Sequence, residues 1–279
     1  GLLKFLFRPI LAHALVSLLF GMCMYALVGK DCKSILTTIV NYLVLCLVIE
    51  MAICYSASMS NLIKSKDRVA DFGEVFTHER EVKAMCDLVK DETERIDSRV
   101  LEPACGDGNF LAEILNRKLG TVKSRYGKNH SDYEKYSIVA VSSMYGVELL
   151  EDNAQHCRER LFGIWNEAYT SNMGKDATDA CREAARFIFH RNILCGDALS
   201  LLQKNGKPII FSEWSLVAGV MLKRRDFELA TMLQMQDLGR QGDLFLSSGS
   251  FDEEVGAYIP QPIAEYKPIE YWRVQCQIE

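Results

Sequence analysis

Hydrophobic residues dominate residues 1–62, and polar and apolar positions alternate in the rest of the chain. Residues 9–29 contain no Asp, Glu, Lys or Arg, and residues 34–60 contain a single charged side chain, Glu50. An apolar stretch of about 20 residues is long enough to cross a bilayer as a helix. We therefore predict that residues 1–62 form a helical hairpin with two membrane spans. A buried hairpin that packs on protein is the alternative.

Basic residues flank both apolar stretches and predict the orientation of such a hairpin. More of them lie outside the pair than in its turn, and cytoplasmic segments carry the excess of Lys and Arg. The domain that follows residues 9–60 is thus expected in the cytoplasm, anchored to the inner (cytoplasmic) membrane. Glu50 is costly inside a bilayer, so we expect it near an interface or against the partner helix. The basic residues are Lys4, Arg8, Lys30, Lys33, Lys64, Lys66 and Arg68.

Strand-like and helical patterns alternate over residues 63–228, which we predict to be one domain. Val100 and Leu101 end a charged run, and apolar residues at helical spacing follow over residues 109–119. A β-rich run from Ser137 to Glu148 precedes a second helical pattern, and strand-like segments begin again at Phe187 and Pro208. This order predicts an α/β fold, a Rossmann-like parallel sheet with helices on both faces and its ligand at the carboxyl ends of the strands.

Three polar features follow the predicted strands. Gly106 and Gly108 lack a Cβ, so the backbone can turn tightly there and approach a ligand closely. Glu148 ends the second strand-like run, where a carboxylate can accept hydrogen bonds from ribose hydroxyls. Asp197 follows the third, where it can accept from an exocyclic amine. Together they favour a nucleotide-like ligand.

In this order the elements resemble the S-adenosylmethionine-dependent DNA methyltransferases that modify adenine at N6, including the modification subunits of restriction systems. The resemblance covers residues 66–227. Residues 73–81 resemble the family's upstream element, which packs over the methionine end of the cofactor, with His78 where proline is usual. Residues 102–110 resemble its glycine-rich motif, and residues 196–199 the motif whose aspartate recognises the adenine ring of the cofactor.

The resemblance implies S-adenosylmethionine as the cofactor, with Glu148 as the ribose-binding acid. The residues implied to bind it are Phe76, Thr77, Glu102, Pro103, Ala104, Gly106, Gly108, Phe110, Glu148, Leu149, Asp197 and Ala198.

The chain departs from the family at the catalytic segment. In the family the fourth strand ends in Asn/Asp/Ser-Pro-Pro-Tyr/Phe, whose polar groups accept from the target amine while the aromatic ring stacks on the flipped base. Residues 211–215 read Phe-Ser-Glu-Trp-Ser and lack both prolines. The resemblance implies a catalytic loop of Ser212, Glu213 and Trp214. The alternative is that Ser212 caps a strand and Trp214 packs in the core.

Residues 229–279 read poorly as further strand–helix units. We predict a loop-rich C-terminal segment, with a short helix over residues 230–238 and a few edge strands after residue 258. The parallel sheet is therefore expected to be truncated or completed differently, without a separate DNA-reading domain.

Charge and cysteine content limit the partners. A formal net charge of -5 provides no general attraction to DNA, so only a local cluster such as Lys223, Arg224 and Arg225 is a candidate DNA contact. A solvated helix face is the alternative for this triplet. The family also implies a restriction or specificity subunit as a partner. The ten cysteines form no C-x-x-C pair, so we predict neither a metal site nor a disulfide framework.

Two functions agree with these patterns. The first is methyl transfer from S-adenosylmethionine to the N6 amine of adenine in DNA. The second is a non-catalytic module, tethered to the membrane, that binds the cofactor or a partner. Residues 212–214 distinguish them, because a catalytic loop must face the bound methyl group whereas a structural segment is buried or points away.

Overall fold

The computed structural model describes residues 64–72, 75–233, 249–252 and 257–277. The chain divides into two compact units, residues 1–75 and 76–279. In the first unit the described part contains helix α3 (Lys66–Phe72). The predicted helical hairpin of residues 1–62 lies outside the described residues. Among the residues described, none of the helices has the length and hydropathy to span a membrane.

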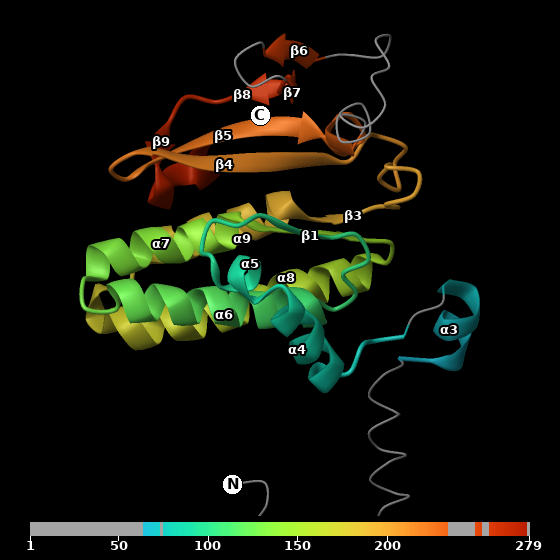
Figure 1. The fold of residues 1–279 in the computed structure, drawn as a ribbon, viewed down its shortest axis with the longest axis horizontal. Helices are drawn as coiled ribbons and strands as arrows, with labels where there is room; N and C mark the ends of the chain where they lie inside the picture. Colours follow the sequence, from blue (N-terminus) through green and yellow to red (C-terminus); the bar gives the residue numbers. More distant parts are fainter. Residues whose placement is uncertain (1–63, 73–74, 234–248, 253–256, 278–279) are drawn as a thin grey trace, which may run out of the picture. The chain divides into compact units, whose positions relative to one another are not determined.

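A three-stranded parallel sheet organises the second unit. Its strands are β1 (Val100–Glu102), β2 (Met144–Glu148) and β3 (Ile193–Cys195), with β2 in the middle. Helices α6 (Asn109–Tyr126) and α7 (His130–Ser142) connect β1 to β2, and α8 (Glu151–Met173) and α9 (Asp179–Asn192) connect β2 to β3. Figure 1 shows α6 and α8 on one side of the strands, whereas α7 and α9 run directly into β2 and β3. The predicted α/β class is confirmed.

The buried faces of α6 and α8 hold this layer together. Leu111 and Leu115 of α6 and Leu161 and Trp165 of α8 have no exposed surface. Their spacing of three or four residues places them on one side of each helix. Each such side chain contributes about 1.5–3 kcal/mol when it is removed from water. Two shorter helices, α4 (Glu79–Leu88) and α5 (Lys90–Glu94), precede β1.

The second and third strands are shorter than their sequence pattern predicts. Residues 137–142 belong to helix α7, and residues 187–192 belong to helix α9. A short apolar run on a buried helix cannot be distinguished from a strand by its hydrophobicity. The helix starts carry a clearer signal, because the side chains of Asn129 and Thr178 accept from the backbone N–H groups of Asp132 and Cys181.

A separate antiparallel sheet follows, which corrects the predicted topology. Strands β4 (Ile210–Ala218) and β5 (Met221–Glu228) form a hairpin, and β8 (Ala264–Glu265) and β9 (Ile269–Glu270) both pair with β5. The prediction that the fourth strand continues the parallel sheet is wrong, since β4 pairs with β5 instead. The reason is local, because a turn at residues 219–220 returns the chain directly to form the hairpin.

The two sheets share a small apolar core. Tyr145 and Val147 of β2 pack with Ile209, Phe211 and Leu229. Within the described residues, a strand hairpin and the first residue of a helical stretch therefore cover this face of β2. The prediction of helices on both faces of the parallel sheet is therefore wrong for this face of β2. Figure 1 shows the β4–β5 hairpin on the side of the parallel strands away from α6 and α8.

The C-terminal segment agrees in part with its prediction. Residues 229–233 are helical, which confirms the start of the helix predicted over residues 230–238. Strands β6 (Gly249–Asp252) and β7 (Ala257–Pro260) form a two-stranded sheet. Strands β7, β8 and β9 lie where short strands were predicted, whereas β6 precedes that stretch. The 3-10 helix η2 (Tyr271–Cys276) follows them.

Candidate functional site

The glycine turn after β1 adopts a conformation that requires glycine. Gly106 has φ 54° and Gly108 has φ 88°, both in the left-handed region. A Cβ at Gly108 would lie 2.7 Å from Sγ of Cys157, which is too close for any side chain. The turn is held by the Cys105 N–H, which donates to the carbonyl oxygen of Val147 at 3.0 Å. Gly108 then caps the start of α6.

Glu148 joins the ends of the first two strands. Its Oε2 accepts from the backbone N–H of Gly106 at 2.8 Å, and its Oε1 accepts from the N–H of Leu150 at 3.0 Å. Asn153 donates to Oε1 as well, at 3.3 Å. The side chain is 8% exposed. Glu148 therefore lies at the glycine turn, and most of its acceptor capacity serves the fold.

Phe76 and Thr77 lie against the same turn. A Cβ built on Gly106 would be 3.1 Å from a ring carbon of Phe76, so the ring packs where a larger residue at position 106 would project. Asn109 donates through Nδ2 to the carbonyl oxygen of Thr77 at 3.1 Å. Arg160 donates to Oδ1 of Asn109 at 2.7 Å. Residues 76–77 are thus fixed to the start of α6.

Asn109 and Arg160 complete this arrangement, and neither was predicted. A signal for Asn109 exists, since it directly follows the glycine turn at the first position of a helix. Arg160 lies on α8, far along the chain, and no local pattern marks it. Only the packing of α8 beside α6 brings its guanidinium to Asn109.

Asp197 follows β3 and lies next to Glu148. The N–H of Gly196 donates to the carbonyl oxygen of Glu148 at 2.9 Å, which continues the pairing of β3 with β2. The carboxylate of Asp197 is exposed and accepts from the N–H groups of Leu199 at 2.9 Å and Ser200 at 3.3 Å. The N–H of Leu199, followed by Ser200, holds the pKa of Asp197 below its ordinary value. The group is therefore a charged acceptor that is open to solvent.

Two exposed leucines border these acids. Leu149 is 44% exposed and Leu199 is 95% exposed. Leu149 directly follows Glu148, and Leu199 lies two residues after Asp197. The carboxyl ends of β2 and β3 therefore present apolar surface beside carboxylates, a combination that suits a ring with polar edges. Ala198 packs against the core between the two sheets.

The other predicted cofactor residues surround the turn. Glu102 ends β1, and burial raises the pKa of its carboxyl group while the N–H of Ala104 partly offsets this. Pro103 and Ala104 are exposed in the turn, and Phe110 packs at the edge of the main core. The contact with the Cys157 thiol, followed by burial, raises the pKa of Cys105. Its thiol stays protonated.

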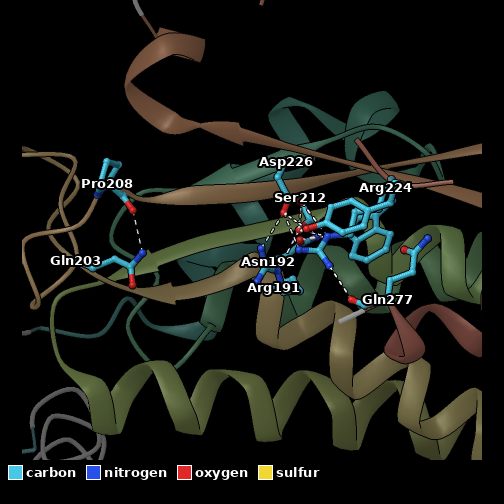
Figure 2. Close-up of polar contacts among 10 residues, drawn as sticks. Arg191, Asn192, Gln203, Pro208, Ser212, Arg224, Asp226 and Gln277 are labelled. Atoms are coloured by element: carbon cyan, nitrogen blue, oxygen red, sulfur yellow. Dashed lines mark hydrogen bonds and ion pairs between the residues drawn. The ribbon is translucent and has the colours of Figure 1, made fainter. Parts of the chain in front are cut away.

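Residues 212–214 form the interior of β4 and no loop, which corrects the sequence prediction (Figure 2). Ser212 has no exposed surface and donates through Oγ to Asp226 at 2.7 Å. Trp214 is 6% exposed and donates through Nε1 to Oδ1 of Asn192 at 3.2 Å. Glu213, on the other face of the strand, pairs with Arg99 and Arg225. The strand continues past Phe211 because each of these residues has a partner on β5.

The basic residues Lys223, Arg224 and Arg225 on β5 (Met221–Glu228) all pair with acidic side chains of the same unit. Arg224 is completely buried, so the prediction that it contacts DNA is wrong, and its position in a strand excludes the alternative of a helix face. Its Nε donates to Oδ1 of Asp226 at 2.8 Å and its Nη2 to Oδ2 at 2.6 Å. Lys223 pairs with Glu265, and Arg225 with Glu213. Only Lys223 and Arg225 keep exposed surface.

The site that emerges comprises the glycine turn, Phe76, Glu148 and Asp197 at the carboxyl ends of three parallel strands. It presents carboxylate acceptors and apolar side chains at the ends of the strands, where parallel sheets bind their ligands. Comparisons of the chain with protein-family models, with curated proteins and with solved structures found no match.

Proposed function

We propose that this chain binds S-adenosylmethionine at the carboxyl ends of β1, β2 and β3, and that its function is methyl transfer to the N6 amine of adenine in DNA. The observation that carries the proposal is the contact set around Gly106. Phe76 packs over this residue and Glu148 accepts its N–H, although the three positions are distant in the sequence. Their meeting supports the order of motifs on which the resemblance rests.

The residues fit such a cofactor at both ends. Gly106 has no Cβ, so the Phe76 ring can pack directly against the glycine turn, where it would lie over the methionine end of the cofactor. Asp197 has an exposed carboxylate with spare lone pairs for an exocyclic amine, and Leu149 and Leu199 supply apolar surface for a ring.

Glu148 fits with one change. A carboxylate has about four lone-pair sites, and three N–H groups already use Glu148. To accept from both ribose hydroxyls, Glu148 must release one of these donors. The Asn153 amide is the weakest of the three at 3.3 Å. We infer that Asn153 yields its place when ribose binds.

The chemistry divides between cofactor and protein. The bound sulfonium supplies an activated methyl group. This chain's residues then have to orient the amine and exclude water. Ser212 and Trp214 donate their polar hydrogens to Asp226 and Asn192. We therefore do not assign them the orientation of the target amine or the exclusion of water.

The same burial favours a second function, a non-catalytic module that binds the cofactor or a partner. Ser212 and Trp214 together carry this alternative, because neither presents its polar group to solvent. In either case we propose that residues 9–60 anchor the chain to the inner membrane with this domain in the cytoplasm. A restriction or specificity subunit remains the proposed partner, and Lys223 and Arg225 remain proposed DNA contacts.

Calorimetric titration of the full chain with S-adenosylmethionine tests cofactor binding. We expect saturable binding that Asp197→Ala weakens by about tenfold or more, the effect of losing a charged hydrogen-bond partner. Asn205→Ala is the matched control, since Asn205 makes the same kind of turn contact in the same loop, to the N–H of Lys207 at 2.9 Å. No heat from a folded chain, or equal effects of both variants, contradicts the proposal.

A methyl-transfer assay separates the two functions. Tritium from labelled S-adenosylmethionine should enter adenine-containing DNA if the chain is the proposed enzyme. Saturable cofactor binding without any incorporation would leave the non-catalytic module as the function. Ser212→Ala serves as an internal check, because its buried hydroxyl should affect stability more than transfer.

A further inference from the structure

A cavity lies at the opposite ends of the parallel strands from the glycine turn. It has a volume of about 440 Å³ and is lined by residues 95–99 before β1, the ends of α6 and α7, and residues 214–216 of β4. Arg99 directly precedes β1, and Ser143 directly precedes β2. The cavity therefore borders the amino ends of these strands and shares no residue with the proposed cofactor site. Its size lies within the range of small-molecule sites.

Positive charge predominates in this cavity, although the whole chain is acidic. Its charged lining residues are Arg95, Arg99, Arg125 and Asp97. Arg95 pairs with Glu92 at 3.1 Å and Arg99 pairs with Glu213, but more than half of each arginine side chain is exposed. The Arg95–Glu92 pair is exposed on both sides and therefore weak, so an anionic ligand can replace it. Glu213 is only 12% exposed, but it also pairs with Arg225, so Arg99 is not its sole partner.

Arg125 provides the clearest unused donor. It is exposed at the end of α6, and among the described residues no hydrogen bond or ion pair engages its guanidinium. A guanidinium presents several N–H donors in a plane that matches phosphate oxygens. Three arginines around one cavity thus suit a phosphate group better than a carboxylate of a single charge.

An aromatic surface lies beside these arginines. Tyr126 and Tyr136 stack with their ring centroids 4.0 Å apart and an interplanar angle of 12°. The ammonium of Lys135 lies 4.8 Å from the centroid of Tyr136. Because Tyr126 and Lys135 both lie over the Tyr136 ring, Tyr126, which is half-buried and lines the cavity, is the aromatic ring that we assign to a ligand. Burial, followed by the contact with Tyr136, raises the pKa of Tyr126, so the ring stays neutral.

From the charge, the stacked ring and the volume, we propose that this cavity binds a nucleoside 5′-phosphate. The phosphate would contact Arg125 with Arg95 and Arg99, and the base would stack on Tyr126. Every base has a flat face that can stack on a tyrosine ring, so the site should bind nucleotides without distinguishing their bases. Since it lies away from Asp197 and Glu148, it binds independently of the proposed cofactor.

Calorimetry of the full chain, kept in a mild detergent, with each of the four nucleoside 5′-monophosphates tests this site. At least one should bind saturably, with an affinity that falls as salt rises. Arg125→Gln should raise its Kd by about tenfold, and Tyr126→Leu by about fivefold or more. Lys123→Gln is the matched control, because Lys123 is exposed on the same helix outside the cavity, and it should change Kd by less than about twofold.

Several results would overturn the proposal. The first is that none of the monophosphates saturates the chain at concentrations up to about 5 mM, because a ligand with a Kd near 1 mM would already be detected at that concentration. Another is an equal effect of Lys123→Gln and Arg125→Gln, which would indicate a diffuse charge effect. Displacement of the nucleotide by S-adenosylmethionine would assign it to the carboxyl ends of the strands instead. Arg125-dependent binding of a single-stranded oligodeoxynucleotide without binding of any monophosphate would also reject a free nucleotide. Failure of S-adenosylmethionine to bind leaves this test unaffected.

Discussion

Two aspartates, one in each sheet region, show how the same residue type serves different ends. Asp226 of the antiparallel sheet is 3% exposed and accepts from Arg191, Arg224 and Ser212. Asp197, after the parallel strand β3, is half-buried, and within the described part of the chain its carboxylate accepts from two backbone N–H groups in its own loop. The first carboxylate is saturated by side chains, whereas the second keeps lone pairs open to solvent. The comparison separates a structural polar core from a surface that can bind a ligand.

The largest expected effect comes from breaking the saturated cluster. Arg224→Met leaves Asp226 buried without its main ion-pair partner, and such a change costs about 3–5 kcal/mol of unfolding free energy. The neighbouring Arg225→Met removes a partly exposed pair and should cost about 1 kcal/mol or less. Denaturant unfolding of both variants measures the difference. Equal losses would mean that burial does not distinguish the two faces of β5.

A second buried cation tests the parallel region. Lys118 of α6 has no exposed surface, and its ammonium donates to neutral oxygens, including Oγ of Ser143 at 2.6 Å and the carbonyl of Ser98. Burial lowers the pKa of Lys118 from 10.5 to about 8. Between these values the unfolded chain binds more protons than the folded one. Stability contributed by Lys118 should therefore rise with pH in this window and stay constant below pH 8.

The measurement is the unfolding free energy of the wild type minus that of Lys118→Met, at several pH values. We expect the difference to grow by an amount on the order of 1–3 kcal/mol between pH 8 and 10.5. Other titrating groups are common to both proteins and cancel. A difference that is flat across this window would show that Lys118 keeps its ordinary pKa in the folded state.

The smallest effects come from two glycines, one that precedes helix α6 and one in its middle. Gly108→Ala should cost about 1–3 kcal/mol, because φ is 88° and the new Cβ would meet Sγ of Cys157 at 2.7 Å. Gly120→Ala in the middle of α6 should instead stabilise by about 0.5–1 kcal/mol, since no heavy atom lies within 4 Å of its Cβ position. Thermal unfolding should give opposite signs. A stabilising Gly108→Ala would contradict the strained turn.

Much of the parallel region could be predicted from local signals. The glycine turn, the helix after it and the acids at residues 148 and 197 all depend on near neighbours in the chain. Residues 137–142 and 187–192 were harder, because a helix buried on several sides carries the apolar content of a strand. Ser212 and Arg224 show the remaining gap. Their environment comes from a hairpin partner and from α9, neither of which a local pattern specifies.

Local sequence is enough to predict that residues 101–111 turn sharply into a helix, because left-handed backbone at residues 106 and 108 is a property of glycine. It also placed an acid at the end of each following strand. Which polar groups remain open to solvent depends on how distant segments pack together. Strand alternation assigns residues to two faces but does not name what covers each face, so the burial of Arg224 and the cavity beside Arg125 depend on segments that meet through packing.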